Sequence, residues 1–165
     1  MTLSNGRFYN PSMYITQHTD YALRVLIHVA ANQDRPEQRI TIAGISELFD
    51  ISRSHLMKVV TKLVREGFLE GVRGKGGGLR LIVPPEQIRI GDVVARMEPS
   101  MVLVECFEED HNCILGPACK LKGVINKALK SFLTTLNEVT LSDLVQQPQT
   151  LKLMQLVPGA PLRRS

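Results

Sequence analysis

The chain has 165 residues, of which 44% are hydrophobic, and a formal net charge of +4. This length and hydrophobic content suit one compact domain with an appendage. No apolar run approaches the roughly 20 residues that a membrane span needs, and three cysteines are too few and odd in number for a disulfide framework. We therefore expect a protein of the reducing cytoplasm with no membrane partner.

The N-terminal part of the chain predicts two helices. Residues 1–12 lack the apolar core of a signal peptide, and we expect a short disordered extension there. Thr19 or Asp20 can cap a first helix that runs to about Ala31. After a polar loop that contains a proline, Thr41 opens a second, shorter helix.

A third predicted helix is apolar on one side and basic on the other. Ser52 caps this helix, which ends before Gly67, a suitable position for a left-handed residue. Because it follows a short helix and a tight turn, it has the place of the recognition helix in a helix-turn-helix. We expect its first turn to meet base edges and its later cations to meet phosphates. The residues of the first turn are Arg53, Ser54 and His55, and the later cations are Lys58, Lys62 and Arg65.

A basic, glycine-rich hairpin comes next. Residues 68–73 and 79–83 read as strands, and the segment between them holds four glycines. The run is not a P-loop, because Gly76 stands where Ser or Thr should follow Lys75. Glycines that let a backbone approach phosphates, flanked by cations, favour nucleic acid. The cations are Arg73, Lys75 and Arg80.

Together these elements predict a mainly α protein with a winged helix-turn-helix domain at residues 13–97 and a two-stranded β wing. Residues 51–80 hold seven basic and two acidic side chains, which indicates a double-stranded DNA partner.

Beyond the wing, the chain predicts a short helix at residues 90–97, a cysteine-containing loop at 98–120 and a long helix at 121–145. The long helix has an apolar stripe, which most simply packs against a second copy of the chain. We therefore expect a C-terminal dimerisation helix, followed by a flexible tail at 146–165. The stripe comprises Leu121, Ile125, Ala128, Phe132 and Val139.

The three cysteines, Cys106, Cys113 and Cys119, lie within fourteen residues on a polar loop. Gaps of six and five residues do not fit the Cys-x2–4-Cys pairs of structural zinc sites. A disulfide switch uses only two thiols and leaves the third unexplained. Longer gaps can wrap an iron–sulfur cluster, with one ligand position left open for a small molecule or another side chain. On spacing alone, the iron–sulfur, zinc and thiol-switch interpretations all stay open.

The order of these elements resembles that of the winged-helix iron–sulfur transcriptional repressors. The resemblance covers residues 13–145 and is specific only when its segments are taken together. The segments that carry it are residues 19–24, 72–79, 88–94, 117–121 and 141–145.

Within that family, the chain is more similar to the nitric-oxide-sensitive repressors than to the regulators of cluster biogenesis. The latter have a histidine ligand three residues after the third cysteine, where this chain has Lys122. The resemblance implies a cluster held by the three cysteines and by an aspartate of the partner subunit's first helix, which here is Asp20. His111 in the loop is a rival for this fourth position. A 4Fe–4S cluster is favoured over 2Fe–2S.

The resemblance further implies a homodimeric repressor that releases its operator when nitric oxide attacks the cluster, and so derepresses genes for nitric-oxide detoxification. One alternative is an iron–sulfur regulator of cluster biogenesis or redox stress. A small iron–sulfur electron-transfer protein is an alternative of a different class. We do not expect an enzyme, since no nucleophile–base arrangement or acid pair stands out.

Overall fold

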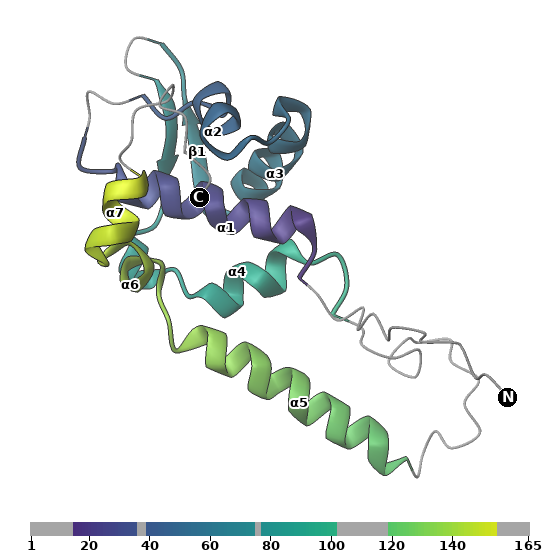
Figure 1. Cartoon of the computed structure of the whole chain (residues 1–165). Helices are drawn as coiled ribbons and strands as arrows, with labels where there is room; N and C mark the ends of the chain where they lie inside the picture. The colour runs from purple at the N-terminus through teal and green to yellow at the C-terminus, as the bar shows by residue number, and fades with distance from the viewer. Residues whose placement is uncertain (1–14, 36–38, 75–76, 102–118, 155–165) are drawn as a thin grey trace, which may run out of the picture.

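The computed structural model describes residues 15–35, 39–74, 77–101 and 119–154. The elements are α1 (Gln17–Ala31), α2 (Ile42–Phe49), α3 (Arg53–Arg65), β1 (Leu69–Val72), β2 (Gly78–Leu81), a 3-10 turn (Pro85–Gln87), α4 (Ile90–Met97), α5 (Lys120–Asn137), α6 (Leu141–Val145) and α7 (Pro148–Met154). Helix α1 crosses the middle of the molecule, with the helix-turn-helix and the hairpin on one side and α4 and α5 on the other (Figure 1). Helices α6 and α7 lie by the C-terminal end of α1 (Figure 1).

Helix α1 begins one turn earlier than its sequence predicts. The N-cap is Thr16, whose Oγ1 accepts a bond from the Thr19 backbone N–H at 3.4 Å. Thr16 is also held from far along the chain, because its N–H and hydroxyl donate to Glu98 Oε1 at 2.9 and 3.1 Å. The expected cap at Thr19 or Asp20 is therefore wrong, while the expected end at Ala31 is confirmed.

The helix-turn-helix forms as its local signals predict. Thr41 and Ser52 cap α2 and α3, and Asp50 turns the chain between them with a left-handed φ of 54°. Gly67, with φ of 80°, follows the end of α3. The apolar side of α3 is buried against α1, and this side comprises Leu56, Val59, Val60 and Leu63.

The two strands pair antiparallel in the register Leu69 with Leu81 and Val72 with Gly78, and both are shorter than expected. A helix-turn-helix followed by a two-stranded antiparallel hairpin, in a mainly helical chain, confirms the predicted winged helix-turn-helix fold class. None of the described helices is long and apolar enough to cross a membrane.

The expected single helix at residues 121–145 is instead two helices. Helix α5 ends at Asn137, and Thr140 starts α6 through a capping box with Asp143. The Thr140 backbone N–H and hydroxyl both donate to the Asp143 carboxylate and lower its pKa below the ordinary value. The helix ends here because residues 139–141 pair with residues 88–90, at the start of α4. The Ile90 N–H donates to Val139 O at 3.1 Å, and the Leu141 N–H donates to Ile88 O at 2.8 Å.

Part of the expected flexible tail is also ordered. Residues 148–154 form α7, which contacts α1 and α6. The Asn32 side-chain amide donates to the carbonyl of Met154 at 3.1 Å, so the end of α7 is joined to the end of α1. The expected extension at residues 1–12 and the remainder of the tail lie outside the described residues.

Acid is expected to destabilise the fold through His28. This side chain is 3% exposed and packs edge-on against Phe49. Burial lowers its pKa below the ordinary 6.5, and a hydrogen bond to the Met154 carbonyl opposes this shift with a smaller effect. The native state therefore binds this proton less readily than the unfolded chain, so stability present above pH 6.5 is lost as the pH falls below it.

The measurement is the urea midpoint at a series of pH values from 8 downward. His28→Gln should flatten part of the decline, because burial also lowers the pKa of His18 and leaves that contribution in place. An equally steep decline in the variant would contradict the assignment to His28.

Candidate nucleic-acid interface and metal-ligand residues

The first turn of α3 places two of the predicted base-contacting residues at the surface. Ser54 and Arg53 are exposed, and Arg53 lies 3.6 Å from Glu47 in a loose ion pair open to solvent. Such exposed pairs contribute at most about 1 kcal/mol, so a phosphate or base can displace Glu47. This turn therefore presents side chains that can enter a groove of DNA.

His55 lies differently from its two neighbours. Its ring is half-buried and meets the ring of Tyr21 edge-on, with centroids 5.1 Å apart. Arg24 also lies over the Tyr21 ring, with its guanidinium carbon 5.9 Å from the ring centroid. His55 thus joins the start of the recognition helix to the first turns of α1.

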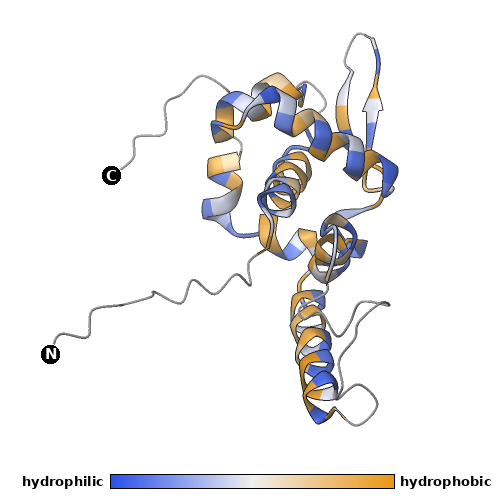
Figure 2. Ribbon diagram, turned by 90° about the vertical axis from the view of Figure 1, so that its right-hand side faces the viewer, coloured by the Kyte–Doolittle hydropathy of each residue, from blue (hydrophilic) through white to orange (hydrophobic). Residues whose placement is uncertain are grey.

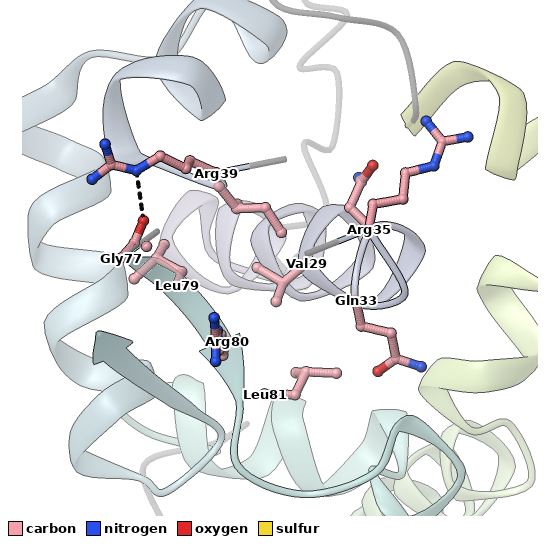
Figure 3. A pocket seen from close by; sticks show the side chains of 11 residues that line it. Val29, Gln33, Arg35, Arg39, Gly77, Leu79, Arg80 and Leu81 are labelled. Carbon is pink, nitrogen blue, oxygen red and sulfur yellow. Dashed lines mark hydrogen bonds between the residues drawn. The ribbon is translucent and has the colours of Figure 1, made fainter. Parts of the chain in front are cut away.

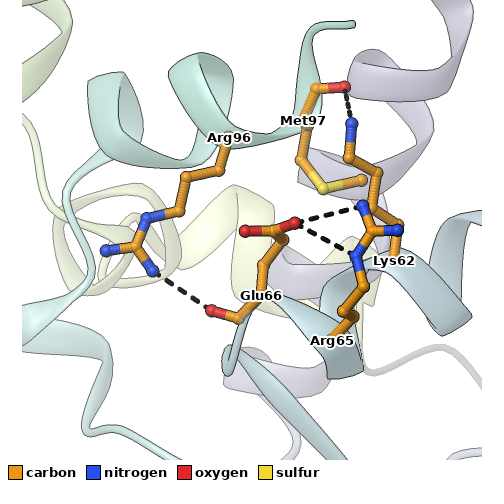
Figure 4. A network of polar contacts seen from close by, with 5 residues as sticks. All are labelled: Lys62, Arg65, Glu66, Arg96 and Met97. Carbon is orange, nitrogen blue, oxygen red and sulfur yellow. Dashed lines mark hydrogen bonds and ion pairs between the residues drawn. The ribbon is translucent and has the colours of Figure 1, made fainter.

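Lys62 does not lie freely on the basic side of α3. Its ammonium group donates to the carbonyl of Met97 at 2.8 Å, which joins α3 to the end of α4 (Figure 4). Arg65 is exposed and pairs with Glu66 at 3.2 Å, while Lys58 is exposed. Of the three predicted phosphate-contacting residues, Lys58 and Arg65 are accessible, and Lys62 has a structural contact instead.

The wing carries Arg73 and Arg80 on its exposed surface, while Lys75 lies outside the described residues. A cavity of about 280 Å³ lies between β2 and the C-terminal end of α1, and Arg39 is among the residues that line it (Figure 3). No sequence pattern singles out Arg39, which is one of two arginines in the polar segment between α1 and α2. Its position beside the wing depends on tertiary contacts that no local pattern signals.

The metal-ligand residues are only partly within the described structure. Cys119 is a half-buried free thiol at the N-terminal end of α5, whereas Cys106, Cys113 and the rival ligand His111 lie outside the described residues. Among the residues that are described, no three His, Cys, Asp or Glu side chains gather as a metal site.

Asp20 lies on the first turn of α1 as a surface carboxylate. It accepts two bonds from Arg24, from Nη2 at 2.7 Å and from Nε at 3.2 Å, and its side chain is 44% exposed. The next residue, Tyr21, makes the contact with His55. The one carboxylate singled out as a ligand is therefore accessible from outside the chain and adjacent to the α1–α3 contact.

The sequence of the chain matches a known family and a curated relative. Residues 15–147 match the Rrf2 family, described as iron-dependent transcriptional regulators. The chain is 44% identical over 146 residues to the HTH-type transcriptional regulator NsrR of Bacillus subtilis, a match that covers 87% of this chain and 99% of that protein.

Among solved structures, the oxidized form of CymR from Staphylococcus aureus aligns with a TM-score of 0.63 and 26% identity, over 81% of this chain and 97% of that one. IscR of T. potens aligns with a TM-score of 0.64 over 82% of this chain and 88% of that one, and at 23% identity it shows the shared fold alone. The family model covers most of the chain, and the relative is 44% identical over nearly its full length. The chain belongs to the Rrf2 family of winged-helix, DNA-binding transcriptional regulators.

Proposed function

We propose that this protein is a homodimeric repressor that senses nitric oxide through an iron–sulfur cluster and then releases its double-stranded DNA operator. The genes it derepresses are those for nitric-oxide detoxification. Support comes from the sequence resemblance to nitric-oxide-sensitive repressors and from membership of a family described as iron-dependent regulators. The observation that carries the proposal is the position of Asp20, an accessible carboxylate one residue from the ring that contacts the recognition helix.

The donor set fits a cluster, for which 4Fe–4S is favoured over 2Fe–2S. Cys106, Cys113 and Cys119 supply soft thiolate ligands, and Asp20 of the partner subunit supplies a harder, weaker one. Cys119 is the N-cap residue of α5, so its sulfur would meet the cluster at the N-terminal end of that helix. When bound, the cluster supplies iron that reacts with nitric oxide, most readily where the weaker carboxylate holds it.

Asp20 can serve as a ligand without giving up Arg24. An ionised carboxylate offers about four lone-pair directions, and the two bonds from Arg24 use two of them. Arg24 then holds the carboxylate in one orientation from its own helix. With the side chain partly exposed, the remaining lone pairs are accessible to a loop of the partner subunit.

The same turn of α1 connects the proposed ligand Asp20 to the recognition helix. Tyr21 follows Asp20 and packs on His55 in the first turn of α3. A shift of α1 after Asp20 loses its ligand bond would change this contact and with it the angle of the recognition helix. Because a dimer fixes the spacing of its two recognition helices, a small rotation in each subunit misplaces both half-sites.

Helix α5 is the proposed dimer interface. It has no buried residue, and Leu121, Val124 and Phe132 are 64%, 63% and 40% exposed. Figure 2 shows the helix extending away from the compact part of the chain with apolar residues along its length. Covering one such side chain contributes about 1.5–3 kcal/mol. A second copy of the same helix would cover the stripe on both chains.

The test combines cluster analysis with DNA binding on the full-length protein purified without oxygen. Iron, sulfide and absorbance establish the cluster, and nitric oxide is then titrated while the affinity for a duplex selected from random DNA is measured. Affinity should fall as the cluster reacts, at a fixed salt concentration. An iron-free protein that also resists reconstitution would rule out the cluster. Undiminished affinity after complete reaction would rule out the sensor, and binding to no duplex would favour an electron-transfer role.

A further inference from the structure

Arg39 joins the segment before α2 to the tip of the wing (Figure 3). Its Nε donates to the carbonyl of Gly77 at 2.9 Å, and its Nη2 donates to the carbonyl of Gly74 at 3.3 Å. These carbonyls stand at the two ends of the hairpin turn, since Gly77 N–H donates to Gly74 O at 3.0 Å. One guanidinium therefore holds both ends of the turn, a task that its planar fork of donors suits.

The neighbouring backbone makes a second connection at the same place. Leu79 N–H donates to Ile40 O at 2.9 Å, and a Cβ built on Gly78 would lie 2.8 Å from that oxygen. Only glycine allows the two backbones to approach so closely. Ile40 itself is buried, and the next residue, Thr41, caps α2. The segment at residues 39–41 thus fixes the wing to the first helix of the helix-turn-helix.

A glycine-rich turn needs such a support to be rigid. Glycine has more backbone freedom than any other residue, and Gly74 adopts a φ of 91°. If the turn were loose in the free protein, DNA binding would have to order it, and the free-energy cost of that ordering would reduce the affinity. Arg39 holds Gly74 and Gly77, the two ends of this turn, through hydrogen bonds that are present without DNA.

We infer that Arg39 is a positioning residue for DNA binding, which holds the wing so that Arg73 and Arg80 face the DNA backbone. The inference deepens the proposed function and rests on its claim that the wing contacts DNA. Arg39 acts through the hairpin geometry and not through its own charge. This distinction separates it from the exposed cations of α3.

The first test compares Arg39→Ala with Arg39→Lys, which keeps the charge but lacks the fixed fork. Both variants should bind the selected duplex about ten-fold more weakly, as expected when a preorganised contact is lost. Backbone amides of residues 77–81 should exchange hydrogen faster in both variants without DNA. Lys130→Ala removes an exposed cation of α5 and should change neither quantity. Full affinity in Arg39→Lys would overturn the inference, because charge alone would then suffice.

The second test is a double-mutant cycle with Arg73→Ala. In the wild type this change should weaken binding, whereas in the Arg39→Ala protein it should have a clearly smaller effect, because the loose wing no longer presents Arg73. Additive effects of the two changes would overturn the role of Arg39 while leaving the wing as a DNA contact. No effect of Arg73→Ala in the wild type would instead remove the wing from the proposed interface, and the inference with it.

Discussion

Replacement of Asp20 by alanine is expected to give a folded protein whose cluster is lost to a chelator at least about ten-fold faster than in the wild type. The protein should fold because the exposed pair with Arg24 contributes only about 0.5 kcal/mol. The cluster should become labile because, in the proposed site, the three thiolates of one subunit lose the fourth ligand that the partner subunit's helix would provide. Absorbance under anaerobic conditions follows the loss, and the thermal midpoint confirms the fold.

Arg24→Ala is the matched control for this change. It breaks the same ion pair and removes the cation from the Tyr21 ring, but it keeps the carboxylate. The cluster should survive in Arg24→Ala and become labile only in Asp20→Ala. Equally fast loss of the cluster in both variants would assign Asp20 the ordinary role of an ion-pair partner. An unchanged cluster in Asp20→Ala would direct attention to His111.

The parts of the fold that the sequence predicted well depend on local chemistry. Thr41 and Ser52 each bond a backbone N–H within three residues, and Gly67 takes a φ that few other residues tolerate. The bounds of α4 follow in the same way from its short apolar pattern, and the structure confirms residues 90–97. Such signals lie within one turn of the residues they control.

The errors occur where distant segments decide the outcome. Thr16 outcompetes Thr19 and Asp20 as the cap of α1 because Glu98, 82 residues away, fixes its side chain. The apolar spacing of residues 121–145 gives no sign of the break after Asn137, which follows from pairing with residues 88–90, at the start of α4. Residues 148–154 looked like a polar tail, yet their helix packs beside the end of α1.

For the candidate site too, local patterns predicted some residues correctly and tertiary contacts decided the others. The exposed positions of Arg53, Ser54, Lys58 and Arg65 follow from helical periodicity, and so does the pairing of Asp20 with Arg24. Lys62 has the same spacing but bonds to the Met97 carbonyl, a partner supplied by α4. Which cations are free for DNA is therefore set by neighbouring helices, and periodicity alone cannot distinguish them.

Charge placed on the exposed stripe of α5 should separate the proposed dimer. The helix is about 27 Å long, and Phe132 lies on the same side as Leu121 and Ala128, which precede it by eleven and four residues. Phe132→Glu removes a large apolar contact and, in a symmetric interface, introduces two carboxylates near each other. We expect the dimer dissociation constant to rise by at least about 100-fold, since each of the two subunits loses an apolar contact worth about 1.5–3 kcal/mol and gains a charge at the interface.

Thr134→Glu is the control, because Thr134 is exposed on the opposite side of the same helix and receives the same charge. Sedimentation across a concentration series should show monomers for Phe132→Glu and dimers for Thr134→Glu, with equal helix content. A monomer can engage only one half-site at a time, so affinity for the selected duplex should fall by about 10²–10⁴, whereas a single half-site should bind as before. A Phe132→Glu protein that stays dimeric would mean that the subunits associate through another surface. The carboxylate of Asp20 would then have to reach its partner by a different geometry.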